Sequence, residues 1–277
     1  MGNVLMMRLT IATIAICAAF MPSTISASEA QDMAAGIKCL PAKKIIKMTR
    51  KFDKLKPEKR DTVTTVPEMK LTAKGAGKLP ERVYFRTGAA EEAFNMDTDG
   101  WVTDFERIGT MDKNGELCMQ GKHFANKKDE EAGINLSIDF DVLFKNTSGT
   151  HTMAELVDGA KDGKSHYKKM FPGPMALMVP KMTHLGVVYL VEDAALASLS
   201  PQISATKNGE KITGLLAENF GDMYVVGLED LQNLGADGLK IEGEKYQLLP
   251  IPSIQKMKDL GFAEDDDGEG EGGEVKD

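Results

Sequence analysis

The segment 136–144 alternates between apolar and polar side chains. Apolar residues recur at every second position, namely Leu136, Ile138, Phe140, Val142 and Phe144, and the polar residues Ser137, Asp139 and Asp141 lie between the first four of them. A period of two places each set on its own face of a β-strand, so the segment predicts a strand with one face in a core and one in solvent. Half-buried strands are typical of antiparallel sheets, and this limits the folds open to the chain.

Further β-forming segments occur in both halves of the chain. The other expected strands are 62–66, 69–73, 82–86, 176–179, 185–191, 223–228 and 240–249. Asp99-Gly100, Asn114-Gly115 and Asn208-Gly209 each predict a hairpin, because Asp or Asn followed by Gly adopts the tight turns that join adjacent strands. We therefore expect a mostly β fold of one or two antiparallel, β-sandwich-like domains, with an α+β fold as the alternative.

Short helices are expected among these strands. Thr152 and Glu155 form a capping box that predicts one of them. The other short helices are expected at 192–199, 229–234 and 253–260.

The ends of the chain differ in composition from the rest. Arg8 precedes an apolar stretch, Leu9 to Phe20, which is typical of a secretory signal peptide and is too short to span a bilayer. Residues 263–277 carry eight acidic side chains and four glycines, and they predict a disordered acidic tail. We predict a signal peptide at 1–27, a β-rich domain at 28–146, a β-rich or α+β domain at 150–262 and the tail at 263–277.

Two cysteines, Cys39 and Cys118, remain once the signal peptide is removed. An exported protein folds in an oxidising compartment, either periplasmic or extracellular, where two thiols usually pair. We expect a structural disulfide between them. A redox or metal pair is the alternative, although no CxxC spacing supports it.

A strongly basic segment occupies residues 38–60, where ten Lys and Arg face only Asp53 and Glu58. Ile45, Met48 and Phe52 recur at three and four residues, so a basic amphipathic helix is expected over 42–56. Such a helix could bind an anionic membrane surface or an envelope polyanion, or dock on the protein's own core. The candidate polyanion-binding residues are Lys43, Lys44, Lys47, Arg50, Lys51 and Lys54.

The segment 95–106 carries side-chain oxygens at the spacing of a calcium loop. Asn95, Asp97 and Asp99 occupy positions one, three and five, Gly100 occupies position six, and Glu106 occupies position twelve. The segment resembles the twelve-residue EF-hand loop, which implies calcium bound by these four oxygen-bearing side chains. A glycine-based hairpin turn is the alternative.

A second candidate metal segment runs from 166 to 184. Thioether and imidazole groups are ligands that Cu(I) prefers, and an exported protein could carry copper in this way. Methionine also fills gaps in cores, so a proline-bounded core strand is the alternative. The candidate copper ligands are His166, Met170, Met175, Met178, Met182 and His184.

Motifs of catalysis are missing from the sequence. It contains no G-x-S-x-G, no H-E-x-x-H and no glycine-rich phosphate loop between a strand and a helix. Any of the four histidines, His123, His151, His166 and His184, would need an acid such as Asp158 or Glu192 beside it to act as a general base.

The leading hypothesis is a non-catalytic binding or scaffold protein of the cell envelope, exported and stabilised by a disulfide. The alternative is a metal-handling protein, and an enzyme of another type is third. We expect no cofactor except for the possible calcium. Nucleic acid is not expected as a partner because the mature chain is acidic and exported.

Overall fold

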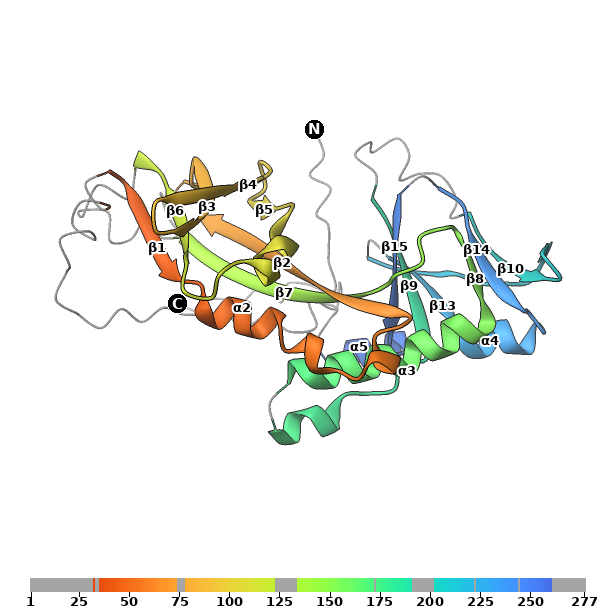
Figure 1. The fold of residues 1–277 in the computed structure, drawn as a ribbon. Coiled ribbons are helices and arrows are strands. Elements are labelled where there is room, and N and C mark those ends of the chain that lie inside the picture. The colour runs from red at the N-terminus through yellow and green to blue at the C-terminus, as the bar shows by residue number, and fades with distance from the viewer. Residues whose placement is uncertain are drawn as a thin grey trace, which may run out of the picture. The chain divides into compact units, whose positions relative to one another are not determined.

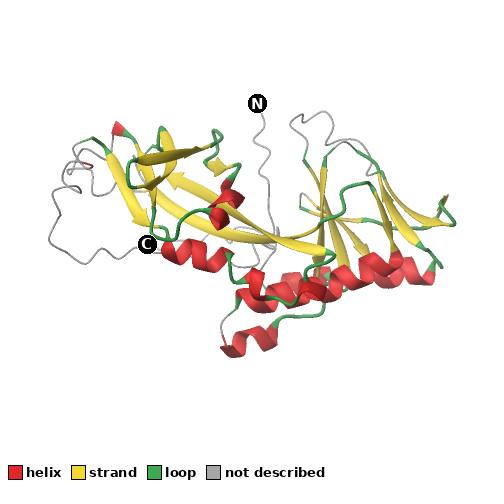
Figure 2. Cartoon of the chain, in the orientation of Figure 1, coloured by secondary structure: helices red, strands yellow, loops and turns green. Residues whose placement is uncertain are grey.

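The structure is a computed structural model, and it describes residues 32, 35–73, 78–122, 134–171, 173–190, 202–221, 223–243 and 245–260. This part of the chain is mostly β, with four antiparallel sheets and few helices (Figure 1, Figure 2). The predicted signal peptide and acidic tail, the helix expected at 192–199, and His123 lie outside the described residues.

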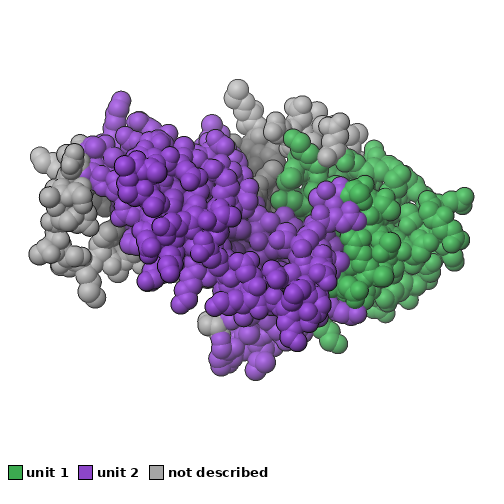
Figure 3. Space-filling model, viewed as in Figure 1, with its two compact units in different colours: residues 1–9, 148–160, 180–277 green, residues 10–147, 161–179 purple. Residues whose placement is uncertain are grey.

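The described residues divide into two compact units, which Figure 3 colours separately. Unit 1 holds 148–160 and the described residues from 180 onward, and unit 2 holds the described residues up to 147 together with 161–179. Each unit contains two of the sheets.

In unit 2 the first sheet has the strand order β1-β6-β3-β4 and the second has the order β5-β2-β7. The strands of the first sheet are β1 (Ile37–Pro41), β6 (Glu116–Gln120), β3 (Arg82–Thr87) and β4 (Ala90–Phe94). Those of the second are β5 (Trp101–Val102), β2 (Val63–Ala73) and β7 (Ile134–Phe144). The strands expected at 82–86 and 136–144 are thus confirmed, and those expected at 62–66 and 69–73 form one continuous strand, β2.

Strands β2 and β7 pair along their full length, from Val63 opposite Phe144 to Ala73 opposite Ile134. The prediction that one face of β7 lies in solvent is wrong, since Asp139 and Asp141 on that face are only 9% and 8% exposed. Helix α3 (Met153–Met170) explains part of this burial. Burial and then the charge of Asp141 raise the pKa of Tyr167 on that helix, so this carboxylate lies near the buried tyrosine.

The helix expected over 42–56 is shorter in the structure. Helix α2 covers Lys43–Thr49 and is followed by two 3-10 turns, η1 (Phe52–Lys54) and η2 (Pro57–Lys59). Leu55 and Lys56 have ψ angles of 144° and 145°, which are extended. Proline disfavours helical backbone in the residue before it, so Pro57 accounts for the extended Lys56.

One of the two hairpins expected in unit 2 is confirmed and the other is wrong. Met96 and Val102 form an antiparallel bridge across the Gly100 turn, as expected. The Gly115 turn instead joins a 3-10 helix, η3 (Phe105–Thr110), to strand β6. Phe105 and Ile108 of η3 are buried, so core packing overrides the β-forming character of this segment.

Unit 1 contains sheets with the orders β11-β10-β14-β8 and β12-β13-β9-β15. The first comprises β11 (Glu210–Ile212), β10 (Ile203–Lys207), β14 (Gly238–Ile241) and β8 (Thr150–Thr152). The second comprises β12 (Glu218–Phe220), β13 (Met223–Gly227), β9 (His184–Tyr189) and β15 (Tyr246–Ile251). Helices α4 (Leu228–Asn233) and α5 (Ile254–Asp259) occupy two of the expected helical segments.

Three expectations in the second half of the sequence are corrected. The strand expected over 240–249 is two strands, β14 and β15, with Gly243 at φ 140° between them. The strand expected at 176–179 is instead part of a 3-10 helix, η5 (Gly173–Met178). The short helix expected after Thr152 is the 18-residue α3, whose residues up to 160 belong to unit 1 and whose residues from 161 belong to unit 2.

Candidate anion-binding surface

Helix α2 forms because its apolar side chains reach the core of unit 2. Ile45 and Ile46 are buried, and Phe52 of η1 packs its ring 5.5 Å from that of Phe140 on β7. The helix has no side-chain cap at Ala42 and no acidic residue in its first turn. Tertiary packing must therefore hold α2 in place, since lysines near a helix N-terminus oppose its dipole.

Four lysines of α2 and η1 are exposed and point away from this core. They are Lys43, Lys44, Lys47 and Lys54, and we call them the basic surface. Within the part of the chain that the structure describes, none of the four forms a salt bridge. No carboxylate of the described residues therefore neutralises these four charges.

The other two basic candidates, Arg50 and Lys51, serve the protein itself. The Arg50 guanidinium donates to the carbonyl oxygens of Gly109 (2.8 Å) and Met111 (2.7 Å). Lys51 Nζ donates to the carbonyl oxygen of Met170 (3.1 Å). Burial, and then the charge of Lys169, lower the pKa of Lys51. These contacts tie α2 and η1 to η3 and to the end of α3.

The C-terminal turn of α3 adds basic residues that the sequence analysis did not include. Lys168 and Lys169 lie in this turn, and Lys169 is close enough to Lys51 to lower its pKa. Lys168 is exposed. These residues are more than one hundred positions from α2, and no local pattern in the sequence indicates that the two segments meet.

The calcium-loop candidates form a turn supported by backbone hydrogen bonds. Asp97 Oδ1 accepts from the amides of Asp99 (3.0 Å) and Trp101 (2.8 Å). Gly100 has φ 86°, and a Cβ there would collide with the Leu71 carbonyl oxygen. Asn95 donates through its backbone and side-chain nitrogens to the Asp104 carboxylate (2.9 and 3.3 Å).

These candidates are not gathered around one point. Among the described residues, the one group of three His, Cys, Asp or Glu ligand atoms within 4.8 Å is Cys39, Glu116 and Cys118. Asp97, Asp99 and Glu106 do not form such a group, and the cysteines of the group that does are bonded to each other. Calcium binding at this loop stays a prediction.

The copper candidates have different surroundings. His166 Nδ1 lies 2.6 Å from Thr65 Oγ1 and Nε2 lies 2.9 Å from the Lys59 carbonyl oxygen, so both ring nitrogens have protein partners. Met170 and Met182 are buried, whereas Met175 and Met178 are exposed on η5. His184 Nδ1 lies 2.9 Å from Thr183 Oγ1. The six candidates are divided between units 1 and 2, and copper binding stays a prediction.

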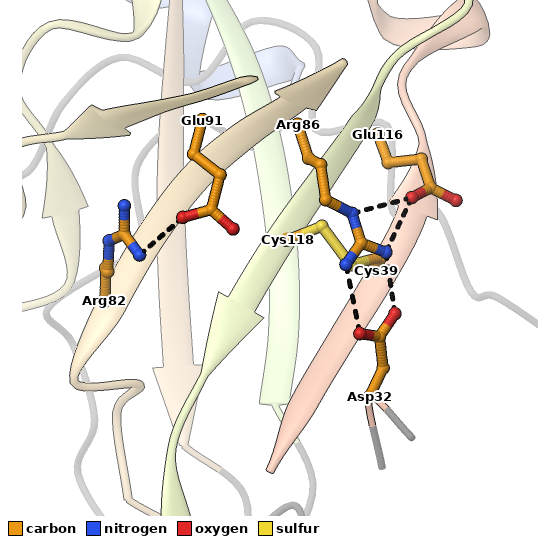
Figure 4. Close-up of a disulfide and its surroundings, with 7 residues drawn as sticks. All are labelled: Asp32, Cys39, Arg82, Arg86, Glu91, Glu116 and Cys118. Carbon is orange, nitrogen blue, oxygen red and sulfur yellow. Dashed lines mark hydrogen bonds and ion pairs between the residues drawn. A yellow bond between two sulfur atoms is a disulfide. The ribbon is translucent and has the colours of Figure 1, made fainter. Parts of the chain in front are cut away.

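The expected disulfide is present. Cys39 on β1 and Cys118 on β6 are directly opposite in the antiparallel pair, with an S–S distance of 2.06 Å. Figure 4 shows the Arg86 guanidinium beside this bond, between the carboxylates of Asp32 (2.7 Å) and Glu116 (2.9 Å). The hydrogen bond from Arg86 lowers the pKa of Asp32. The disulfide thus has paired charges beside it, and we interpret it as a structural bond.

A buried polar network in unit 1 also escaped the sequence analysis. His151 Nδ1 lies 3.3 Å from Glu155 Oε1, and His151 Nε2 lies 3.0 Å from the Tyr246 hydroxyl. The Gly149 amide donates to the same hydroxyl (3.0 Å). Burial lowers the pKa of His151 and raises that of Tyr246. Both shifts favour the neutral forms of the two side chains.

Comparison with known proteins adds no relative from which a function could be transferred, since no family model, curated protein or solved structure matches the chain. Among the described residues, no helix is long and apolar enough to cross a membrane. The functional argument therefore depends on the surfaces of this chain alone.

Proposed function

We propose that this chain is a non-catalytic binding or scaffold protein of the cell envelope that attaches to an anionic envelope component through its basic surface. One observation carries the proposal: Lys43, Lys44, Lys47 and Lys54 are exposed and have no salt bridge within the described residues. Neighbouring basic side chains that no carboxylate neutralises attract anionic polymers and headgroups.

The protein's charge distribution supports a local attraction. The chain as a whole has a formal net charge of −8, so its total charge would be repelled by an anionic surface. The screening length at physiological salt is about 8 Å, so a bound anion responds mainly to the charges nearest to it. A cluster of lysines can therefore bind an anion despite the acidic total.

A second part of the proposal is that the protein is exported. We propose export to a periplasmic or extracellular location, which the disulfide favours. The intact mass of the exported protein tests this, because cleavage after Ala27 gives a chain that starts at Ser28. A mass that includes residues 1–27 would contradict it.

We also propose that the two sheets within each unit pack as a β-sandwich. In unit 1, His151 of β8 and Tyr246 of β15 belong to different sheets and are 3.0 Å apart. In unit 2, both sheets contribute fully buried apolar side chains, Val83 and Leu117 from the first and Met69 and Ile138 from the second. An experimental structure in which Tyr246 points away from His151 would contradict the pairing in unit 1.

The test of anion binding is sedimentation of the mature protein with vesicles that contain phosphatidylglycerol. Wild-type protein is expected to sediment at about 50 mM NaCl and to be released at about 500 mM, since salt screens exposed charges. A variant with Lys43, Lys44, Lys47 and Lys54 changed to Gln is expected to lose at least about tenfold in partition coefficient, given about 1 kcal/mol for each lysine near such a surface.

The matched control changes the same amount of charge elsewhere. Lys113, Lys181, Lys207 and Lys245 are also exposed, and none forms a salt bridge within the described residues. Changing these four to Gln is expected to leave binding within about twofold of wild type. Equal losses in both variants would show that net charge alone controls binding, and no loss in the first would overturn the proposal.

A further inference from the structure

The 3-10 helix η5 presents large apolar side chains to solvent. Met175 is 52%, Leu177 is 82% and Met178 is 75% exposed, and no residue of η5 is buried. Among the described residues only Leu216 and Leu260 are comparable. We call Met175, Leu177 and Met178 the apolar tip. Single exposed apolar residues are common, but three within four positions form a local apolar patch, which is a feature typical of binding surfaces.

The apolar tip follows directly on the basic end of α3. Lys168 and Lys169 are in the last turn of that helix, and η5 begins at Gly173. Gly173 is four positions after Lys169, which limits the distance between their Cα atoms to about 14 Å. In Figure 1, η5 is the green coil that follows the end of α3.

Lys54, at one end of the basic surface, belongs to the same neighbourhood of unit 2. Lys51 Nζ is hydrogen-bonded to the carbonyl oxygen of Met170, the last residue of α3, and lies near the charge of Lys169. Lys51 directly precedes η1, which carries Lys54. The contact therefore fixes η1 beside the point from which η5 emerges, and both are parts of one compact unit.

We propose that the anionic component is a lipid bilayer, and that the apolar tip inserts into its headgroup region while the lysines beside it contact anionic headgroups. This inference rests on the proposed function and names its partner. A soluble polyanion would use the lysines alone and would leave the tip in water. A bilayer would contact both the apolar tip and the lysines, because apolar side chains enter its interface next to a layer of negative charge.

The chemistry of the tip suits shallow insertion. Methionine and leucine are apolar and unbranched at Cβ, so they adapt to an irregular, fluid environment. None of the three side chains has a charge to desolvate, and Lys168 can keep its ammonium in the headgroup layer. Insertion would bury side chains that water now surrounds, which favours binding through the hydrophobic effect.

The first experiment separates the tip from the lysines. A Leu177→Ser/Met178→Ser variant is expected to bind phosphatidylglycerol vesicles at least about tenfold more weakly than wild type, since it lacks two of the apolar side chains that insertion would bury. Its binding to soluble polyphosphate should match wild type. Because both side chains are exposed, the variant is expected to keep its melting temperature. The control Leu216→Ser removes a side chain that is 79% exposed in unit 1, and it should bind like wild type.

The second experiment locates the tip directly. A tryptophan introduced as Leu177→Trp should shift its emission to the blue on vesicles and be quenched by brominated lipid, whereas Leu216→Trp should do neither. Unchanged vesicle binding in the serine variant, together with no quenching at position 177, would overturn the inference. If that variant dissociates a dimer and binds vesicles normally, the tip is a protein contact and the inference is wrong.

The same data separate failure of the inference from failure of the proposed function. If the tip variants bind both vesicles and polyphosphate as wild type does, and the four-lysine variant binds neither, the basic surface is an anion site without a lipid anchor. If wild type binds neither probe, the proposed function itself fails.

Discussion

At the scale of single residues, Arg50 shows why a basic sequence segment is not uniformly a binding surface. Its guanidinium makes two short hydrogen bonds to the carbonyl oxygens of Gly109 and Met111. Lys47, one turn earlier, is exposed. The sequence predicts polyanion binding equally for all six basic candidates. Helical spacing cannot show which side chains reach carbonyl groups of a distant segment.

We therefore expect Arg50→Ala to lower the free energy of unfolding by about 2–3 kcal/mol, since it removes two charge-assisted hydrogen bonds. Lys47→Ala should change it by less than about 0.5 kcal/mol. Urea denaturation of both variants measures the difference. Equal stabilities would show that the Arg50 contacts add nothing to the fold.

Asp97 tests whether the Gly100 turn needs a metal. Its carboxylate accepts from two backbone amides, so Asp97→Ala should cost about 1–2 kcal/mol of stability in the absence of calcium. Asp99→Ala is the control, because no hydrogen bond of the Asp99 side chain supports the turn among these described contacts. Thermal melting with and without about 1 mM calcium should give the same values for wild type. A calcium-dependent rise that Asp99→Ala abolishes would instead support the calcium loop.

The lowered pKa of His166 predicts how the free energy of unfolding depends on pH. Burial lowers its pKa from 6.5, and the nearby charges of Lys145 and Arg60 lower it further, against the Lys59 carbonyl and Asp162, which raise it. The unfolded state thus takes up the proton first as pH falls. The neutral ring's contribution is complete above pH 6.5 and is lost as pH falls from there through the folded pKa.

Melting temperatures measured between about pH 8 and pH 5 check this. Wild-type stability should decrease below pH 6.5, and His166→Gln should show a shallower decrease. An unchanged slope in the variant would mean that another group, such as His151 with its similarly lowered pKa, controls the transition.

At the scale of elements, the Cys39–Cys118 disulfide joins two adjacent strands and closes a loop with a sequence separation of 79. On the chain-entropy account, changing both cysteines to Ser should cost about 4–5 kcal/mol of stability. Denaturation of wild type under reducing conditions should approach that of the double variant, and the variant itself should not respond to the reductant. A loss below about 1 kcal/mol would contradict a structural role.

Long strands could be predicted from the sequence, whereas short helical turns could not. Strands β2 and β7 carry a period-two pattern over many residues, and the structure has them at the expected places. Segments 105–110 and 173–178 contain β-forming or apolar residues and yet form 3-10 helices. In η3 the burial of Phe105 and Ile108 decides the conformation, and such burial depends on partners far along the chain.

At the scale of the whole molecule, the two compact units raise the question of domain organisation. Helix α3 contributes to both units, since residues up to 160 belong to one and those from 161 to the other. The sequence predicts a division at 146–150, but it cannot reveal that a later helix continues back into unit 2. The proposed domains 28–146 and 150–262 remain a prediction that separate expression of each segment would test.

The central claim is that the basic surface of α2 and η1 attaches the protein to an anionic envelope component. The most direct measurement is the affinity of the mature, disulfide-bonded protein for phosphatidylglycerol vesicles as a function of NaCl concentration. We predict that wild type and the Lys113/Lys181/Lys207/Lys245→Gln control lose affinity steeply as salt rises, because exposed charges are screened. The Lys43/Lys44/Lys47/Lys54→Gln variant should bind weakly, with a much flatter salt dependence. If this variant keeps the wild-type affinity and slope, the basic surface is not the attachment site and the claim is wrong.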